Sequence, residues 1–183
     1  MTEIKEKRSA HGVARSLYEI VELIAFTVLA VLLLMTFVCR HSVVVGSSMD
    51  KTLSDKQHLL ISDLFYTPKQ GDIVVFDDLT VNDHSLGESS PLIKRVIAVG
   101  GQTVKITNDQ VFVDGQMLDE DYVYFSSDRN YKEIEEFVIP QGYLFVMGDH
   151  RNVSLDSEDF GVIDERAVVG KVFMRLRPFT IFK

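Results

Sequence analysis

Cysteine is nearly absent from this sequence: Cys39 is the only one among 183 residues, which excludes a disulfide within the chain. The residues directly before it, Thr36, Phe37 and Val38, are not the small residues that precede the modified cysteine of a lipoprotein. We therefore expect Cys39 to be a small apolar residue at the end of the hydrophobic run in which it lies.

Excess positive charge and metal-binding spacings are absent too. With 19 lysines and arginines against 27 aspartates and glutamates, the net charge is −8, so there is no general electrostatic case for binding nucleic acid. The five histidines are scattered without the spacing of a metal site: His11, His41, His58, His84 and His150. The sequence has no internal repeat, and with 46% apolar and 25% charged residues its composition is that of an ordinary folded domain.

One long hydrophobic run lies near the N-terminus. Leu23–Cys39 spans 17 positions without a charge, and Ile20 and Val21 extend the run. As a helix it measures about 26 Å, and the extra turn with a snorkelling Arg40 brings it to a hydrocarbon core of about 30 Å. A cleaved signal peptide is the alternative, but the run is not followed by the small residues of a cleavage site. We predict a retained anchor in membrane lipid at residues 20–39, between a tail at 1–19 and a domain at 40–183. Within the tail, the polar residues Met1–Ala14 are expected to be poorly ordered, with a helix only towards Arg15.

Basic residues flank the run on both sides. Four precede it and three follow it closely: Lys5, Lys7, Arg8 and Arg15 against Arg40, Lys51 and Lys56. This weak bias favours a cytoplasmic N-terminus at the cell membrane, with the domain extracytoplasmic. The remaining length, about 140 residues, suits one domain.

Past residue 40 the pattern predicts a mainly β domain, because no stretch has a strong helical period. Candidate strands are rich in β-branched and aromatic residues and are bounded by turn formers: 43–45, 58–65, 71–76, 92–99, 104–106, 111–113, 137–147 (interrupted at 140–142) and 168–182. The charged, aromatic segment 119–136 is expected to be a loop with at most a short helix.

Ser48 follows the first candidate strand of the domain. Gly46 ends that strand, and a hydroxyl just past a strand end is accessible to a substrate whose backbone can approach the glycine closely. An ordinary serine-glycine loop is the alternative.

Lys94 lies within the candidate strand 92–99. Alternation places it on one face with Leu92, Val96 and Ala98, and places Arg95 on the other face. Burial lowers the pKa of a lysine, and a neutral amine can act as a general base on a serine hydroxyl. A lysine that snorkels at a sheet edge is the alternative.

The stretch Met147–Ser157 is dense in turn formers and hydrogen-bonding side chains. It is either a surface loop or a loop beneath a site that supplies a hydroxyl and a carboxylate. Asp149 or Asp156 can pair with Arg95. A Ser-His-Asp triad can also be drawn from Ser48, His150 and Asp156, and the sequence does not decide whether they converge.

Four motifs occur in order behind the anchor: GSSMDKTL at 46–53, GDIVVF at 71–76, KRVIAVGG at 94–101, and GDHR through SLDS at 148–157. From the anchor onwards the chain resembles a bacterial type I signal peptidase of the small, single-span, Gram-positive kind. The resemblance implies a serine peptidase with a Ser–Lys dyad. The fold it implies is a β-rich catalytic core with an inserted smaller β region, preceded by one transmembrane helix.

By motif position, the resemblance implies that Ser48 is the nucleophile, Lys94 the general base and Ser154 the hydroxyl that orients the lysine. The backbone N–H of Ser48 would donate to the oxyanion, whereas Gly46 stands where some relatives carry a second oxyanion-hole hydroxyl. The partners implied are secretory preproteins, whose signal peptides bind as extended strands with small residues at −1 and −3. The substrate-binding positions would be Val44, Val45, Gly46, Met49, Leu92 and Ile93. Arg95, Asp149 and Asp156 would support the site, and no metal or cofactor is expected.

The chain departs from the family pattern at five positions. Lys51 and Gly100 replace common prolines, His150 and Val153 each replace an asparagine, and Glu158 replaces an arginine that pairs with the carboxylate at Asp156.

A signal-peptidase-like assembly factor, for instance in pilus formation, is an alternative in which precursors are bound without general peptidase duty. A second alternative is a self-cleaving repressor, whose catalytic domain has a similar Ser–Lys core. The predicted anchor and the lack of a DNA-binding segment argue against it. Oligomeric state is not predicted.

Overall fold

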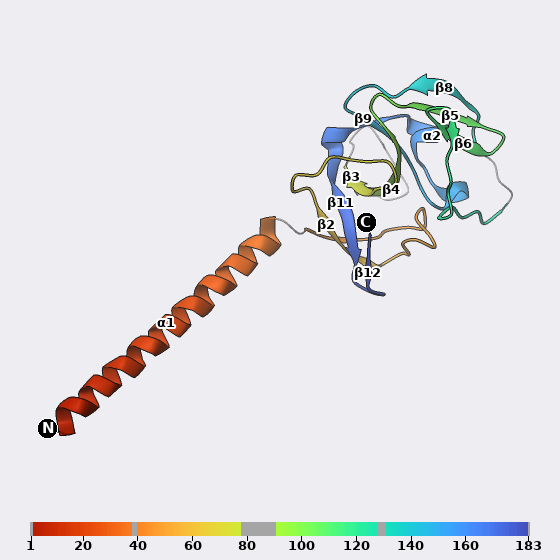
Figure 1. Ribbon diagram of the computed structural model, residues 1–183. Helices are drawn as coiled ribbons and strands as arrows, with labels where there is room; N and C mark the ends of the chain where they lie inside the picture. The colour runs from red at the N-terminus through yellow and green to blue at the C-terminus, as the bar shows by residue number, and fades with distance from the viewer. Residues whose placement is uncertain (1, 38–39, 78–90, 128–130, 183) are drawn as a thin grey trace. The chain divides into compact units, whose positions relative to one another are not determined.

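The computed structural model describes residues 2–37, 40–77, 91–127 and 131–182 (Figure 1). Within the long N-terminal helix, side chains are described for residues 15–33. The expectations for Cys39 and His84 therefore lie outside the described residues. The chain divides into two compact units, Met1–Arg40 and His41–Lys183.

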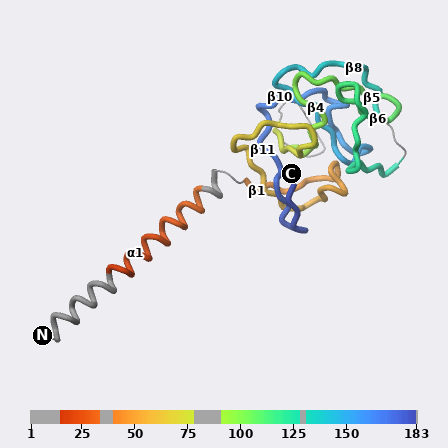
Figure 2. Tube along the Cα trace, viewed as in Figure 1, coloured from red at the N-terminus to blue at the C-terminus, as the bar shows by residue number. Residues whose placement is uncertain are grey.

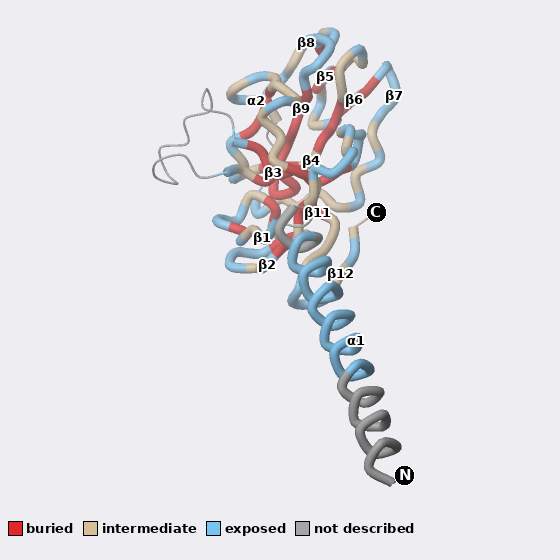
Figure 3. The backbone as a smooth tube through the Cα atoms, turned by 90° about the vertical axis from the view of Figure 1, so that its left-hand side faces the viewer, coloured by how far each residue is buried: buried red, intermediate tan, exposed pale blue. Residues whose placement is uncertain are grey.

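The described residues of the first unit form one helix, α1 (Thr2–Phe37), and Arg40 at its boundary begins the first strand. Its segment Arg15–Leu33 is long and apolar enough to cross a membrane, with a mean hydropathy of 2.1, and its residues are exposed, as the pale blue tube in Figure 3 shows. The N-terminal residues, expected to be poorly ordered, are instead helical from Thr2. Residues 2–37 contain no proline, so nothing stops the apolar helix from continuing into the polar residues before it.

The second unit contains two antiparallel sheets. The larger has the order β1-β2-β11-β3-β4-β9-β10, and β12 also pairs with β11. Its strands are β1 (Arg40–Val43), β2 (His58–Ser62), β3 (Ile73–Phe76), β4 (Leu92–Val99), β9 (Tyr143–Met147), β10 (Ile163–Asp164), β11 (Val168–Arg175) and β12 (Thr180–Ile181). The mainly β fold predicted from the sequence is confirmed.

The smaller sheet is inserted between β4 and β9, and the chain path through it is traced in Figure 2. Its order is β7-β6-β5-β8, formed by β5 (Thr103–Thr107), β6 (Gln110–Val113), β7 (Gln116–Met117) and β8 (Ile134–Val138). Helices in the described part of this unit are short: α2 (Ser157–Phe160) and the 3₁₀ turns η1 (Arg151–Val153) and η2 (Glu165–Ala167).

Several strands differ in length from the predicted ranges. β1 ends at Val43, so Val44 and Val45 lie beyond it, ahead of Gly46, whose φ of 87° turns the chain. β2 ends at Ser62, before a turn in which the N–H of Tyr66 donates to the carbonyl of Asp63. The ranges 137–147 and 168–182 each divide into two strands, and β4 matches its predicted range.

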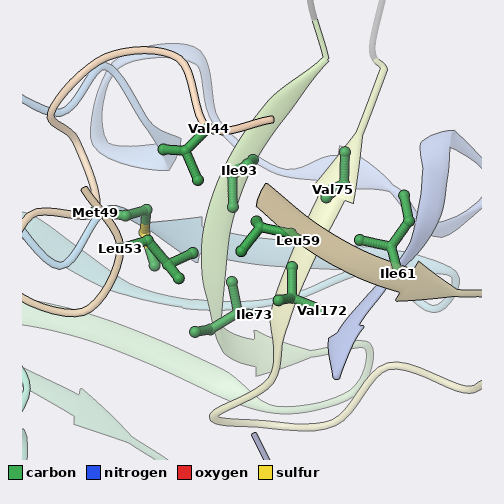
Figure 4. Close-up of a cluster of buried hydrophobic side chains, with 9 residues drawn as sticks. All are labelled: Val44, Met49, Leu53, Leu59, Ile61, Ile73, Val75, Ile93 and Val172. Carbon is green, nitrogen blue, oxygen red and sulfur yellow. The ribbon is translucent and has the colours of Figure 1, made fainter. Parts of the chain in front are cut away.

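Both faces of β4 are buried, which the alternation of its sequence did not predict. Ile93 belongs to a hydrophobic cluster with residues of β2, β3 and β11 (Figure 4). Ile97 and Ala98 belong to a second cluster that packs the smaller sheet against β9. Lys94 thus lies in a strand that is covered on both sides, at the centre of the domain.

Candidate active site

Ser48 lies in the loop between β1 and β2, in a tight turn. The N–H of Asp50 donates to the carbonyl of Ser47 at 3.0 Å, and the N–H of Leu53 donates to that of Met49 at 2.7 Å. Met49 and Leu53 are buried in the cluster shown in Figure 4, which anchors the turn to the sheet. Ser48 itself is half-buried, and its carbonyl accepts the N–H of His150 at 2.9 Å.

Lys94 is buried on β4, opposite Val74 of β3, with 2% of its surface exposed. Its Nζ donates to the hydroxyl of Ser154 at 2.9 Å. Lys94, the candidate general base, is therefore buried. Its amine is bonded to Ser154, the hydroxyl that the family resemblance implies as its orienting partner.

Gly148 brings the loop after β9 against both Ser48 and Ser154. A methyl group at this glycine would lie 2.3 Å from Ser154 Oγ and 2.5 Å from the carbonyl oxygen of Ser48. These distances are too short for a Cβ atom, so only glycine fits at position 148 without a shift of its neighbours. Through Gly148, the structure therefore places Ser154, the hydrogen-bond partner of Lys94, beside the backbone of Ser48.

Asp156 is fully buried behind this turn and makes several hydrogen bonds. Its Oδ2 accepts the N–H of Gly148 at 3.0 Å, and its Oδ1 accepts the N–H of Glu158 at 3.2 Å as the N-cap of α2. Burial raises the pKa of Asp156, against the lowering effects of the Gly148 N–H, the charge of Lys94 and the Ser154 hydroxyl. Ser154 thus accepts a hydrogen bond from Lys94, and its hydroxyl lies where it lowers the pKa of Asp156.

Arg95 points to the opposite side from Lys94 and pairs with Asp149. Its Nε donates to Oδ1 at 2.8 Å and its Nη2 to Oδ2 at 2.6 Å. The sequence left Asp149 and Asp156 as possible partners of Arg95, and in the structure the partner is Asp149. The guanidinium also donates to the carbonyl of Gly71 at 2.9 Å and lies 3.9 Å from the ring centre of Tyr122.

The alternative Ser-His-Asp triad is not assembled. His150 Nδ1 lies 3.2 Å from the carbonyl oxygen of Ser47 and 3.8 Å from Asp50 Oδ2. Its buried Nε2 has no hydrogen-bond partner among the described residues. The ring therefore supports the loop before Ser48 and is bonded to neither the Ser48 hydroxyl nor Asp156. Lys51, another departure from the family pattern, lies over the Tyr124 ring that His150 also contacts.

The residues predicted to bind substrate fall into two groups. Val44, Met49 and Ile93 are buried in one cluster (Figure 4), so the side chain of Met49 belongs to the core. Val45 and Gly46 are exposed, and Leu92 is half-buried. The second group is the part of the predicted set that an incoming chain can reach.

The sequence did not identify Arg151 and Glu120, which form a second buried ion pair behind Gly148. The only sequence signal is the density of charged and aromatic residues in 119–136, which predicts a loop without naming a partner for Arg151. In the described part of the chain no group of three or more His, Cys, Asp or Glu is placed to hold a metal ion.

Comparison with known proteins gives one consistent family. The family model described as signal peptidase, peptidase S26, matches residues 17–177. A probable signal peptidase I-1 of Synechocystis sp. is 35% identical over 166 residues, covering 87% of this chain and 82% of the relative. Signal peptidase IB of Staphylococcus aureus is 34% identical over 165 residues, covering 80% and 82%. A crystal structure of a signal peptidase I from Enterococcus faecalis is 28% identical with a TM-score of 0.46, covering 58% of this chain and 97% of that one. Since the family model spans most of the chain and the Synechocystis and Staphylococcus relatives match it over most of their own length, the chain belongs to the S26 family of signal peptidases.

Proposed function

We propose that the protein is a membrane-anchored serine endopeptidase that removes N-terminal signal peptides from exported preproteins with a Ser48–Lys94 dyad. The observation that carries this proposal is the buried Lys94 amine. It is bonded to Ser154 at 2.9 Å, beside a glycine turn that touches the backbone of Ser48. Burial destabilises a charged amine relative to a neutral one, and a neutral amine can accept the serine proton.

The chemistry is acyl transfer in two steps. Ser48 Oγ attacks the carbonyl carbon of the −1 residue while Lys94 takes its proton, and the backbone N–H of Ser48 stabilises the oxyanion. Lys94 then delivers the proton to the leaving amine of the mature protein. Water hydrolyses the resulting ester, with Lys94 again as the base.

The substrate binds as an extended strand beside the exposed residues Val45 and Gly46 and the half-buried Leu92. Val44 and Ile93 form an apolar floor beneath it, which favours small residues at −1 and −3. The anchor would be α1, with a cytoplasmic N-terminus and the domain outside the membrane, where cleavage sites emerge.

The alternative of an assembly factor without peptidase duty has less support. The relatives are named as peptidases, and both dyad residues are present with the lysine amine held by Ser154. The altered loop after Gly148 motivates this alternative, and there His150 packs against the ring of Tyr124.

The test uses the detergent-solubilised full chain and a precursor with an Ala-x-Ala site, with the products identified by mass. Wild type is expected to cut after the −1 alanine. Ser48→Ala and Lys94→Ala should each lose activity by about a thousandfold or more, and the double variant should lose little more, because the two residues act as a unit. Ser47→Ala is the matched control, since Ser47 contributes its backbone carbonyl and its side chain is exposed. Activity of either dyad variant within tenfold of wild type would overturn the assignment.

A further inference from the structure

Arg151 is the most buried basic group on the loop after β9, with 1% of its side chain exposed. One side of its guanidinium donates from Nε to the carbonyl of Gly148 at 3.0 Å. The other side forms a bidentate pair with Glu120, including Nη1 to Oε2 at 3.1 Å, and also bonds the hydroxyl of Tyr131. Arg151 therefore joins the Gly148 turn to two residues from the segment between β7 and β8.

Glu120 also has a second hydrogen-bond partner besides Arg151. Its side chain is 10% exposed, and its Oε1 accepts the hydroxyl of Tyr122 at 3.0 Å. The ring of Tyr122 in turn lies against the guanidinium of Arg95, the partner of Asp149. Burial opposes the charge of Arg151, but the hydrogen bonds and charge of Glu120 outweigh it and raise the pKa of Arg151, so the guanidinium stays charged.

The backbones of the two segments are also joined. The N–H of Tyr124 donates to the carbonyl of Asp149 at 2.8 Å, and the N–H of Arg151 donates to the carbonyl of Tyr124 at 3.1 Å. The segment from Glu120 to Tyr124 thus lies alongside the loop after β9. It is attached to that loop by backbone hydrogen bonds at Tyr124 and by the ion pair at Glu120.

Gly148 connects this pair with the proposed chemistry. Its carbonyl is held by Arg151, its N–H by Asp156, and its Cα packs against Ser154 and the Ser48 carbonyl without room for a methyl group. A shift of the Gly148 carbonyl therefore changes the spacing between Ser48 and the Lys94–Ser154 pair. Misplacement of reacting groups by about 1 Å can cost about a hundredfold in rate.

We propose that Arg151 and Glu120 are a positioning pair, through which the segment between β7 and β8 sets the geometry of the Ser48–Lys94 dyad. This inference rests on the proposed function. Neither residue touches the reacting atoms, so the pair acts through Gly148 and should govern kcat more than KM.

The experiment compares Glu120→Gln, Arg151→Met and the double variant in the solubilised full chain, with precursor cleavage measured below the melting temperature. Each single variant is expected to lower kcat by about tenfold to a hundredfold with KM within about threefold. The double variant should be no worse than either single variant, because it leaves no unpaired buried charge. Lys132→Met is the matched control: it breaks an ion pair with Asp159 in the same region, with 61% of the lysine side chain exposed, and should leave kcat unchanged.

A second readout does not need activity. Hydrogen exchange of the segment 144–155, followed by mass spectrometry, should speed up in both single variants and stay at the wild-type rate in Lys132→Met. Unchanged kcat in the folded single variants, or unchanged exchange, would overturn the positioning role. If wild type cleaves no precursor while exchange responds as expected, the peptidase assignment fails and the coupling of the two segments stands.

Discussion

Arg95 and Asp149 form a bidentate ion pair that fastens the loop after β9 to β4, one residue from the buried Lys94. The carboxylate is almost fully buried and the guanidinium is 11% exposed, so the pair is shielded from solvent. Because Arg95 and Lys94 point to opposite sides of β4, the strand supplies the proposed base on one side and a fixed attachment for the loop on the other.

Arg95→Ala should therefore lower both stability and activity. The change leaves the Asp149 carboxylate buried and uncompensated, which costs roughly 3–5 kcal/mol in the free energy of unfolding. The measurement is denaturant unfolding of the full chain in detergent, with precursor cleavage measured in parallel. Arg166→Ala is the control, because Arg166 pairs with Asp164 in the same bidentate manner while 89% exposed, and should melt with wild type. An Arg95→Ala protein as stable as wild type would show that the pair does not hold the loop.

This pair also shows what the sequence can reveal. Alternation along 92–99 separates Arg95 from Lys94, and the sequence leaves Asp149 and Asp156 open as its partner; only the structure shows that the partner is Asp149. Strands such as β4, β5 and β6 were recognised because β-branched residues and turn formers mark them locally.

The Arg151–Glu120 pair was missed for a physical reason. Its partners are 31 residues apart, and they meet only because the smaller sheet folds back onto the loop after β9. The local pattern of apolar and polar residues in the sequence does not indicate a contact between segments this far apart. The burial of both faces of β4 has the same origin, since one cover comes from the inserted sheet.

Membrane topology follows from the basic residues around α1 and stays a prediction. If the domain lies outside the membrane as predicted, protease added to intact protoplasts is expected to cut the exposed positions between Asp119 and Ser127. An epitope tag before Met1 should be cut only after detergent is added, which controls for leaky cells. Protection of the 119–127 segment with digestion of the tag would reverse the orientation and separate the site from emerging precursors.

Glu158 should make the protein less stable as pH rises from about 4.5 to about 7. Burial and then the charge of Asp156 raise the pKa of Glu158 from 4.5 to about 7. The folded state therefore binds the proton more tightly than the unfolded state. The cost of ionising the buried group is absent below the unfolded value, grows through this window and is complete above the folded value.

Glu158→Gln should remove this cost. Its unfolding free energy should exceed that of wild type by about 2 kcal/mol more at pH 8 than at pH 4.5, measured by urea unfolding. Glu135→Gln, at an exposed position, is the control and should show no such difference. If the gap between Glu158→Gln and wild type is the same at both pH values, the carboxylate does not titrate as described.

Gly148→Ala tests whether the turn around which the site is built tolerates a side chain. The new methyl group would lie 2.3 Å from Ser154 Oγ and 2.5 Å from the Ser48 carbonyl oxygen. A backbone oxygen cannot move aside cheaply, so the loop after β9 must shift and carry Ser154 away from Lys94. Overpacking of this kind costs about 1–3 kcal/mol in stability, and kcat for precursor cleavage should fall at least about tenfold. Gly115→Ala is the matched control, since its φ of 74° strains an alanine but the added methyl group meets open space far from the site. It should lower the melting temperature slightly and leave kcat unchanged. A Gly148→Ala enzyme with wild-type kcat would mean that the contacts of Gly148 with Ser48 and Ser154 do not set the geometry of the dyad.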